Sequence, residues 1–198
     1  MALILVGGQA KNIGKTTLVC NIISAFRQFH WTAVKITAHL HQPEGCELLS
    51  QGLGWSVWEQ HPIEARTDTG RFLSAGAERA LLVRAEQEYL DEPCTMLEQQ
   101  FSALNWIVES SSATTFLKPD LSLLIVDAAR AEFKDSAQEQ LASSDVLLLR
   151  GTDQEDRARE IRRSFREIPI FPLLETGLHE EIDLLVRKAL ASFRLSSS

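Results

Sequence analysis

The sequence is poor in cysteine, in long apolar runs and in positive charge. Its three cysteines, Cys20, Cys46 and Cys94, lie far apart without a CxxC pair, which excludes a disulfide framework and fits a reducing compartment. The first apolar run, residues 2–6, has no basic residue before it and is too short for a signal peptide or a bilayer span. We therefore expect a cytoplasmic protein rather than a secreted or membrane protein.

Acidic residues outnumber basic ones by 27 to 20, which gives a formal net charge of −7. This balance argues against broad binding to nucleic acid or to anionic membranes. The apolar share of 44% is that of a globular protein that buries a core. With 198 residues and no internal repeat or linker, we expect a single domain over residues 1–198.

Short runs rich in Val, Ile and Leu alternate with amphipathic stretches along the chain. Such runs predict strands that are buried on both faces of a parallel sheet. The runs are residues 2–6, 32–37, 79–84, 105–109, 121–126, 145–150 and 168–173. The helical stretches are residues 14–29, 86–104 with a break at Pro93, 135–144, 153–165 and 178–193. The alternation predicts an α/β fold with a mostly parallel sheet of about seven strands and helices on both faces.

Residues 38–67 show only weak periodicity, and we expect a long active-site or substrate loop there, with a short helix as the alternative. The segment contains His39, His41 and Cys46, which could bind a soft metal or a substrate, or be plain loop residues. Its two tryptophans, Trp55 and Trp58, could close over a base or a partner, although their spacing is more typical of core packing.

The most specific motif is VGGQAKNIGKTT at residues 6–17, which follows an apolar strand and opens an amphipathic helix. This context is that of a phosphate-binding loop, or Walker A motif, whose backbone N–H groups surround phosphate oxygens. The helix N-terminus adds unpaired donors and a positive dipole end. The predicted nucleotide-binding residues are Gly8, Gln9, Ala10, Lys11, Asn12, Ile13, Gly14, Lys15, Thr16 and Thr17. Lys15 is expected to reach the β- and γ-phosphates, and Thr16 to bind Mg²⁺.

Five residues separate Gly8 from Gly14, one more than in the standard motif. In this spacing the loop resembles that of dethiobiotin synthetase and its relatives, which implies the three-layer P-loop NTPase fold. Lys11 is similar to the extra signature lysine of the partition and septum-site ATPases, but it lies one position closer to Gly14. A solvated loop lysine near the γ-phosphate is the alternative.

Polar residues fall where the predicted strands end, at the edge where open parallel sheets bind ligands. Lys35 lies near the end of one strand and Asp68 follows the 38–67 segment. Glu109 ends a strand and Asp127 comes directly after another. Carboxylates are the ligands that Mg²⁺ prefers, so Asp68, Glu109 and Asp127 are candidate metal ligands. The alternative is that these acids cap the helices that follow.

The stretches WTAVKITAHLH, at residues 31–41, and TDTGRFLSAGAERALLVRA, at residues 67–85, resemble molybdopterin-guanine dinucleotide biosynthesis protein B. WIVESSS, at residues 106–112, resembles a segment that this family shares with dethiobiotin synthetase, except that Ser110 replaces a glycine. The resemblance implies that Glu109 and Asp68 are the Mg²⁺ carboxylates and that Lys35 is a second phosphate or substrate contact. It also implies that the chain can form a homodimer.

The base-binding residue is less clear from the sequence. Many GTP-binding relatives carry Asn/Thr-Lys-x-Asp after a late strand, and here the position reads RGTD, which retains only Asp153. Asp153 could read a guanine base or serve as the N-cap of the next helix.

Together these features predict Mg²⁺-dependent binding of ATP or GTP with hydrolysis or transfer of the γ-phosphate, in which Lys15 and Lys35 would be catalytic. The resemblance places this activity in cofactor biosynthesis, with a small-molecule substrate or a cofactor-assembly protein as partner. The alternative is a nucleotide-switched adaptor with little turnover of its own.

Overall fold

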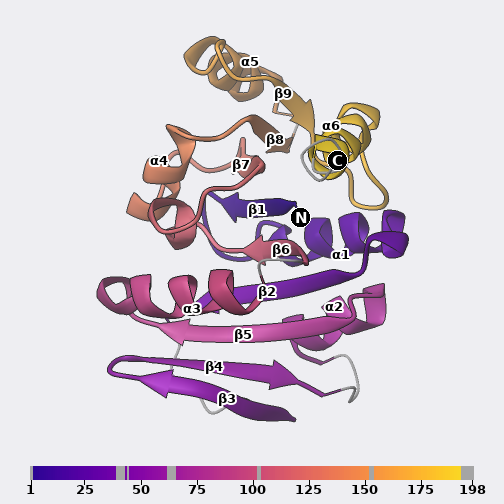
Figure 1. Cartoon of the computed structure of the whole chain (residues 1–198). Coiled ribbons are helices and arrows are strands. Elements are labelled where there is room, and N and C mark those ends of the chain that lie inside the picture. Colours follow the sequence, from indigo (N-terminus) through magenta and orange to yellow (C-terminus); the bar gives the residue numbers. More distant parts are fainter. Residues whose placement is uncertain are drawn as a thin grey trace.

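Nine strands form one mixed sheet in the computed structural model, which describes residues 2–38, 43, 45–61, 66–101, 104–151 and 154–192. The strand order is β3-β4-β5-β2-β6-β1-β7-β8-β9 (Figure 1). The strands are β1 (Leu3–Gly8), β2 (Trp31–Thr37), β3 (Cys46–Gly52), β4 (Trp55–Gln60), β5 (Arg79–Ala85), β6 (Asn105–Glu109), β7 (Leu121–Asp127), β8 (Val146–Arg150) and β9 (Ile170–Pro172). The seven strands from β5 to β9 in this order are parallel, and they are the seven expected from the sequence.

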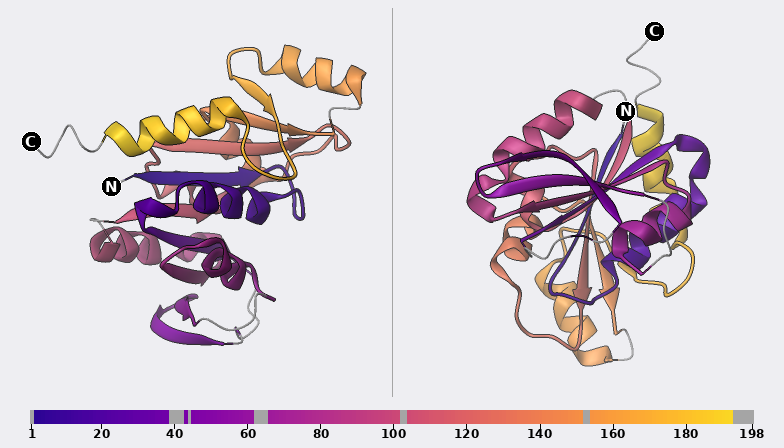
Figure 2. Two further views of the ribbon diagram at one scale, coloured as in Figure 1. Left: turned by 90° about the vertical axis from the view of Figure 1, so that its right-hand side faces the viewer. Right: turned by 90° about the horizontal axis from the view of Figure 1, so that it is seen from below.

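Helices cover both faces of the sheet (Figures 1 and 2). They are α1 (Lys15–Ala25), α2 (Asp68–Ala75), α3 (Asp91–Phe101), α4 (Asp135–Leu141), α5 (Glu155–Ser164) and α6 (Glu180–Ser192). Buried side chains of α1, α2 and α6 pack in one cluster against one face. Those of α3 pack on the opposite face at the β5 end, and those of α4 and α5 pack at the β8 end. The three-layer α/β architecture is confirmed.

Residues 38–67 contain a β-hairpin rather than the long loop that their weak periodicity predicts. Strands β3 and β4 pair antiparallel, and β4 pairs antiparallel with β5, so the hairpin extends the sheet from seven strands to nine (Figure 2). Residues 53–54 form the turn, and Gly54 has a φ of 72°, a left-handed conformation that glycine adopts easily. Trp55 and Val57 point to the buried side of β4, as alternation in a strand requires.

The structure also corrects the expected break of a helix at Pro93. A short 3₁₀ turn covers Gln87–Tyr89, and α3 begins at Asp91, so that Pro93 lies in the first helical turn. The first N–H groups of a helix have no carbonyl partner within it, and proline there sacrifices no hydrogen bond. Pro93 therefore marks the start of the helix instead of interrupting it. No helix among the described residues is long and apolar enough to cross a bilayer.

The register of the central strands brings distant polar residues together at one edge of the sheet. Val6, which precedes the phosphate loop, is the partner of Glu109 at the end of β6. Lys35 of β2 is the partner of Glu109 on the other side of β6. Because parallel strands place their carboxyl ends side by side, the loop after β1, the lysine of β2 and the glutamate of β6 meet at one place.

Candidate functional site

A cleft of about 1150 Å³ opens at the carboxyl ends of the parallel strands. Six cationic side chains line it: Lys11, Lys15, Lys35, Arg71, Lys134 and Arg150. Its lining includes three carboxylates, those of Asp68, Glu109 and Glu175. Since the chain as a whole carries a net charge of −7, this surplus of positive charge is local, and it favours a ligand that carries several negative charges.

The predicted phosphate loop forms one wall of the cleft, and residues 11–17 all belong to the lining. Gly14 has a φ of 103° and is the N-cap of α1, a backbone conformation that a side chain would strain. Ile13 is fully buried in the core beneath α1, which anchors the loop to the fold. The ammonium of Lys15 folds back over the loop and donates to the carbonyl of Ala10 at 3.0 Å.

Glu109 is buried at the bottom of the cleft, where both of its carboxylate oxygens are engaged. One oxygen accepts a hydrogen bond from the hydroxyl of Thr16 at 2.8 Å. The other lies 3.0 Å from the ammonium of Lys35. Thr16 and Glu109, two of the residues predicted to bind Mg²⁺, are therefore in direct contact.

Asp68 opens α2 and completes this group of side chains. Its carboxylate accepts a short hydrogen bond from the Lys35 ammonium, which thus bridges Asp68 and Glu109. Arg71, one turn later in α2, lies 3.8 Å from Asp68 and donates to the hydroxyl of Thr17 at 3.3 Å. The start of α2 is thereby linked to the start of α1.

The two central lysines differ in their pKa values. Burial lowers the pKa of Lys15 from 10.5 to about 8; the charge of Glu109 opposes this change, and the charges of Lys134 and Lys35 add to it. Burial also lowers the pKa of Lys35, but the charge of Glu109 and the hydrogen bond to Asp68 outweigh it and raise that pKa overall. The positive charge of Lys35 is thus balanced by two carboxylates, whereas the Lys15 ammonium forms no ion pair among the described residues and is available to bind an anionic ligand.

The donor set fits Mg²⁺, which takes hard oxygen ligands and commonly binds through one or two carboxylates, phosphates and water. The hydroxyl of Thr16 and the carboxylates of Glu109 and Asp68 are such donors. A cation already lies between the two carboxylates, since the Lys35 ammonium contacts both. Among the described residues, no group of three or more His, Cys, Asp and Glu side chains could hold a metal ion, so Mg²⁺ would need phosphate oxygens to complete its coordination.

Solved structures of other proteins share this architecture. HypB from Helicobacter pylori in complex with nickel superposes with a TM-score of 0.56 at 13% identity, over 96% of this chain and 87% of that one. The Zn(II)-bound YjiA GTPase from E. coli superposes with a TM-score of 0.51 at 16% identity, over 91% of this chain. The match spans 60% of the YjiA chain. No protein-family model matches the sequence, and no curated protein matches it.

The chain has the P-loop NTPase fold. In this fold the loop after the first strand and the helix that follows it form the phosphate site. The sequence motif at residues 6–17 occupies that place, between β1 and α1. The finer group, that of dethiobiotin synthetase and molybdopterin-guanine dinucleotide biosynthesis protein B, stays a hypothesis.

The first three residues of the predicted loop, Gly8, Gln9 and Ala10, do not line the cleft. A Cβ atom on Gly8 would lie 2.6 Å from Ile13 Cδ1 and 3.2 Å from Lys15 Cδ, so glycine leaves room for the loop to close over itself. Gln9 is buried, and its side chain bonds to the segment that follows β7. Gly8 and Gln9 therefore support the conformation of the loop from its protein side and do not face the cleft.

Asp127 also lies outside the lining of the cleft. It ends β7, and its Oδ1 accepts a hydrogen bond from the N–H of Ala129 at 2.9 Å. Its Oδ2 lies 3.6 Å from Arg130. Asp127 thus stabilises the turn after β7, a structural role similar to the helix capping named above as the alternative to metal binding. We do not include Asp127 in the metal set proposed below.

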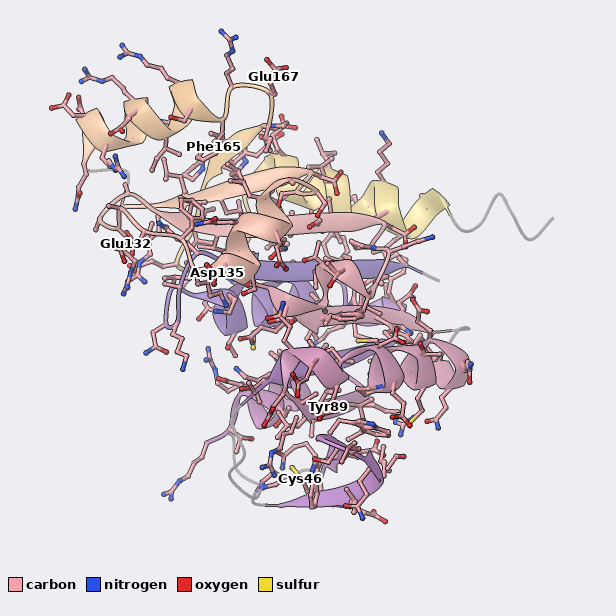
Figure 3. All side chains as sticks on the ribbon, turned by 90° about the vertical axis from the view of Figure 1, so that its left-hand side faces the viewer. Cys46, Tyr89, Glu132, Asp135, Phe165 and Glu167 are labelled. Carbon is pink, nitrogen blue, oxygen red and sulfur yellow. The ribbon has the colours of Figure 1, made fainter. Side chains whose placement is uncertain are left out.

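Three predicted residues, His39, His41 and Asp153, lie outside the described residues. Cys46, the third member of the soft-metal hypothesis, belongs to β3 and donates to Gln60 Oε1 at 3.4 Å. Figure 3 labels it at the hairpin end of the molecule, and burial raises the pKa of its thiol. Cys46 does not line the cleft.

Two of the three tryptophans are core residues. Trp31 is fully buried and donates from its indole N–H to the carbonyl of Phe26 at 2.9 Å. Trp55 is buried against α3 and donates to Glu92 at 2.8 Å. Trp58 is partly exposed and donates to Ser56 at 2.9 Å within β4. None of the three lines the cleft.

Several lining residues were not predicted from the sequence. Lys134 comes from the segment before α4, and Arg150 ends β8 and donates to the carbonyl of Asn12 at 3.2 Å. Residues 173–175 follow β9 and form the far wall. Lys134 and residues 173–175 belong to no recognisable motif, and Arg150 opens the RGTD segment, in which only Asp153 is a predicted ligand contact. Their only signal is position, because each lies at or beyond the carboxyl end of a parallel strand.

Proposed function

We propose that this chain binds ATP or GTP with Mg²⁺ in the cleft and cleaves the terminal phosphate, by hydrolysis or by transfer to an acceptor, as part of cofactor biosynthesis. The observation that carries the proposal is the contact between Thr16 and Glu109 at 2.8 Å beside Lys15 and Lys35. It joins the helix start that binds phosphate to a buried carboxylate that can hold the metal.

The chain's own residues supply most of what phosphoryl transfer requires, which is positioning and charge neutralisation. Lys15 would move from the Ala10 carbonyl to the phosphates, because a charged phosphate oxygen is a stronger acceptor than a carbonyl. Lys35 would keep Glu109 and Asp68 oriented and present its remaining N–H to a phosphate or substrate. Bound Mg²⁺ would offset the negative charge of the phosphates.

In the reaction, an acceptor oxygen forms a bond to the γ-phosphorus as the bond from that phosphorus to the β–γ bridging oxygen breaks. The acceptor's proton is released, and the nucleoside diphosphate leaves with the bridging oxygen. With water as the acceptor, the products are the nucleoside diphosphate and inorganic phosphate. With a small substrate, the acceptor would enter beside Lys35 and residues 110–112, where the lining is polar.

The second candidate function is that of a nucleotide-switched adaptor, in which a homodimer of this chain would bind a cofactor-assembly protein. One observation favours it: Gln9, near the start of the phosphate loop, is hydrogen-bonded to the segment that leads from β7 into α4. A change of nucleotide state at the loop could thereby alter a surface helix.

The first test is a thermal-shift panel of ATP, GTP, their diphosphates and their non-hydrolysable analogues, each with and without Mg²⁺. We expect a Mg²⁺-dependent rise of the midpoint in the wild type and none in Lys15→Ala. Lys118→Ala, which removes an exposed lysine outside the cleft, is the matched control. Unchanged affinity in a folded Lys15→Ala protein would defeat the phosphate-loop assignment.

The panel also separates the candidates. A shift with GTP alone supports Asp153 as the base-reading residue and the molybdenum-cofactor-like role, whereas a shift with ATP alone favours a relation to dethiobiotin synthetase. Phosphate release is then measured with and without candidate acceptors. Acceptor-dependent turnover supports the enzyme, and nucleotide-dependent dimerisation with negligible turnover supports the adaptor.

A further inference from the structure

Lys134 brings a positive charge into the cleft from an unexpected part of the chain. It immediately precedes α4, between Glu132 and Asp135, which are labelled in Figure 3. Its side chain lines the same cleft as the phosphate loop. Its backbone N–H donates to the carbonyl of Gln9 at 3.3 Å, which attaches this residue directly to the start of the loop.

Gln9 holds the whole segment between β7 and Lys134 in place. Its side-chain amide donates to the carbonyls of Arg130 at 3.2 Å and Glu132 at 2.9 Å. Its side-chain oxygen accepts from the N–H of Asp127 at 2.8 Å. Gln9 itself is 1% exposed, so its side chain lies inside the protein, and its three bonds hold the segment against the loop. The position of Lys134 is therefore fixed by the phosphate loop itself.

The electrostatic surroundings of Lys134 are unfavourable for a lysine without a ligand. Among the described residues it has no carboxylate within ion-pair distance. Burial lowers the pKa of its ammonium, the charge of Lys11 lowers it further, and only the charge of Glu109 opposes them. Its own charge in turn lowers the pKa of Lys15. Lysines that repel one another are stabilised when a multiply charged anion binds among them.

The geometry indicates which end of the anion Lys134 would meet. In a phosphate loop the conserved lysine reaches the β- and γ-phosphates, and here the Lys15 ammonium rests on the carbonyl of Ala10. Ala10 therefore lies near the terminal-phosphate end of the loop. Lys134 is attached to Gln9, the residue next to Ala10. Lys134 and Lys15 thus line the same part of the cleft, where the charge of one acts on the other.

We propose that Lys134 binds the terminal phosphate of the nucleotide together with Lys15, and that Gln9 is the residue that positions it. This inference rests on the proposed function, because it assumes that the cleft takes a nucleoside triphosphate. It assigns to this chain a second phosphate-binding lysine from its own segment after β7. Such a lysine distinguishes the triphosphate from the diphosphate, since only the triphosphate places charge beside it.

The test compares affinities for the triphosphate and the diphosphate of one nucleoside, measured by calorimetry with Mg²⁺ on the full chain. Lys134→Met keeps most of the aliphatic stem and removes the charge. We expect triphosphate affinity to fall about tenfold or more, and diphosphate affinity to fall less than about threefold. Lys134→Arg, which keeps the charge, is expected to retain most of the preference for triphosphate. Lys118→Met is the matched control for the loss of one positive charge.

The outcomes separate this inference from the proposed function. A wild-type protein that binds neither nucleotide overturns both. A wild type that binds, with Lys134→Met losing equally for both nucleotides or behaving as Lys118→Met does, overturns the role of Lys134 alone. Unfolding midpoints without ligand identify a variant that fails to fold, and in that case Lys134→Gln, which also removes the charge, decides: a retained preference for triphosphate overturns the role of Lys134.

Discussion

Glu109 accepts a hydrogen bond at 2.8 Å from the hydroxyl of Thr16, although 93 residues separate the two in the chain. The bond joins the first turn of α1 to the end of β6. Lys35 of β2 contacts the same carboxylate and also binds Asp68 of α2, so side chains of four elements meet in one group around a buried glutamate. Under the proposed function, this convergence would place a metal ion and phosphate next to each other in the cleft.

Replacing Glu109 tests the metal site. Glu109→Gln keeps the shape of the side chain and its contact with Thr16 but removes the charge that Mg²⁺ requires. We expect the gain in nucleotide affinity on adding Mg²⁺ to shrink by about tenfold or more, while the metal-free affinity stays close to that of the wild type. Calorimetric titrations with and without Mg²⁺ measure both.

Asp127→Asn is the comparison for Glu109→Gln. It removes a carboxylate that lies outside the cleft, at the end of β7, which is separated from β6 by β1. We expect it to leave the Mg²⁺ dependence unchanged, since asparagine can still accept the N–H of Ala129. If Asp127→Asn lost the Mg²⁺ effect and Glu109→Gln kept it, the proposed metal set would be wrong.

The low pKa of Lys15 predicts a pH dependence of nucleotide affinity. Its ammonium has a pKa of about 8 without ligand, and only the charged form binds phosphate strongly. Affinity should therefore fall as pH rises from 7 to 9, with proton uptake on binding at the higher pH. Lys35 has a raised pKa and stays charged over this range. Calorimetry in buffers of different ionisation enthalpy detects the uptake, which Lys15→Met should abolish.

The same group acts on stability with the opposite sign. Folded Lys15 releases its proton near pH 8, whereas the unfolded lysine keeps it up to about 10.5. The unfolded state thus binds more protons in this window, and the Lys15 contribution to the free energy of unfolding rises with pH. Urea denaturation of wild type and Lys15→Met at pH 7 and pH 9 should show a smaller rise, or a larger fall, in the variant.

Gln9→Leu tests the link between the phosphate loop and the segment after β7. The substitution removes the hydrogen bonds to Arg130, Glu132 and Asp127 while filling similar space. We expect a loss of about 2–3 kcal/mol in the free energy of unfolding, because buried N–H and carbonyl groups lose their partners. We also expect a reduced preference for triphosphate over diphosphate, because Lys134 loses its support. A fully retained preference would contradict the positioning role.

Gly7 allows α4 to pack onto β1. A Cβ atom at Gly7 would lie 1.5 Å from Gln140 Oε1, which is buried and accepts no hydrogen bond within the described part of the protein. Gly7→Ala should therefore lower the free energy of unfolding by about 1–3 kcal/mol. The double variant Gly7→Ala/Gln140→Ala should lose less free energy of unfolding than the sum of the two single variants, because the shorter side chain at residue 140 removes the clash. Urea denaturation of the four proteins measures the coupling, and strict additivity would contradict it.

The sequence predicted those parts of the fold whose residues are apolar throughout. The parallel strands lie where their Val, Ile and Leu runs are, and six of the seven are largely buried, whereas the edge strand β9 is partly exposed. Strand β3 was missed because its side chains are largely exposed and show little apolar pattern. The signal for the hairpin was present in β4, where buried Trp55 and Val57 alternate with more exposed residues, directly after the turn glycine Gly54.

The candidate site divides in the same way. Lys15, Thr16 and Glu109 belong to motifs, and a motif fixes spacing along the chain. Lys134 and Arg150 reach the cleft only through the packing of β7, β8 and the segments after them, and no local pattern reports that packing. The role of Gln9 was misplaced for a related reason: its position in the motif indicates a ligand contact, whereas its burial directs the side chain into the protein.

The placement of β1 has a consequence for how the protein is made. Its partners are β6 and β7, so Val6 pairs with Glu109 and Gly8 with Ile125. On the ribosome, at about 5–20 residues per second, roughly 100 further residues take some 5–20 seconds to emerge after β1. During that interval the apolar first strand has α1 beside it but no strand partner in its own chain. Under the proposed function, a nucleotide could assist folding only after β6 has emerged.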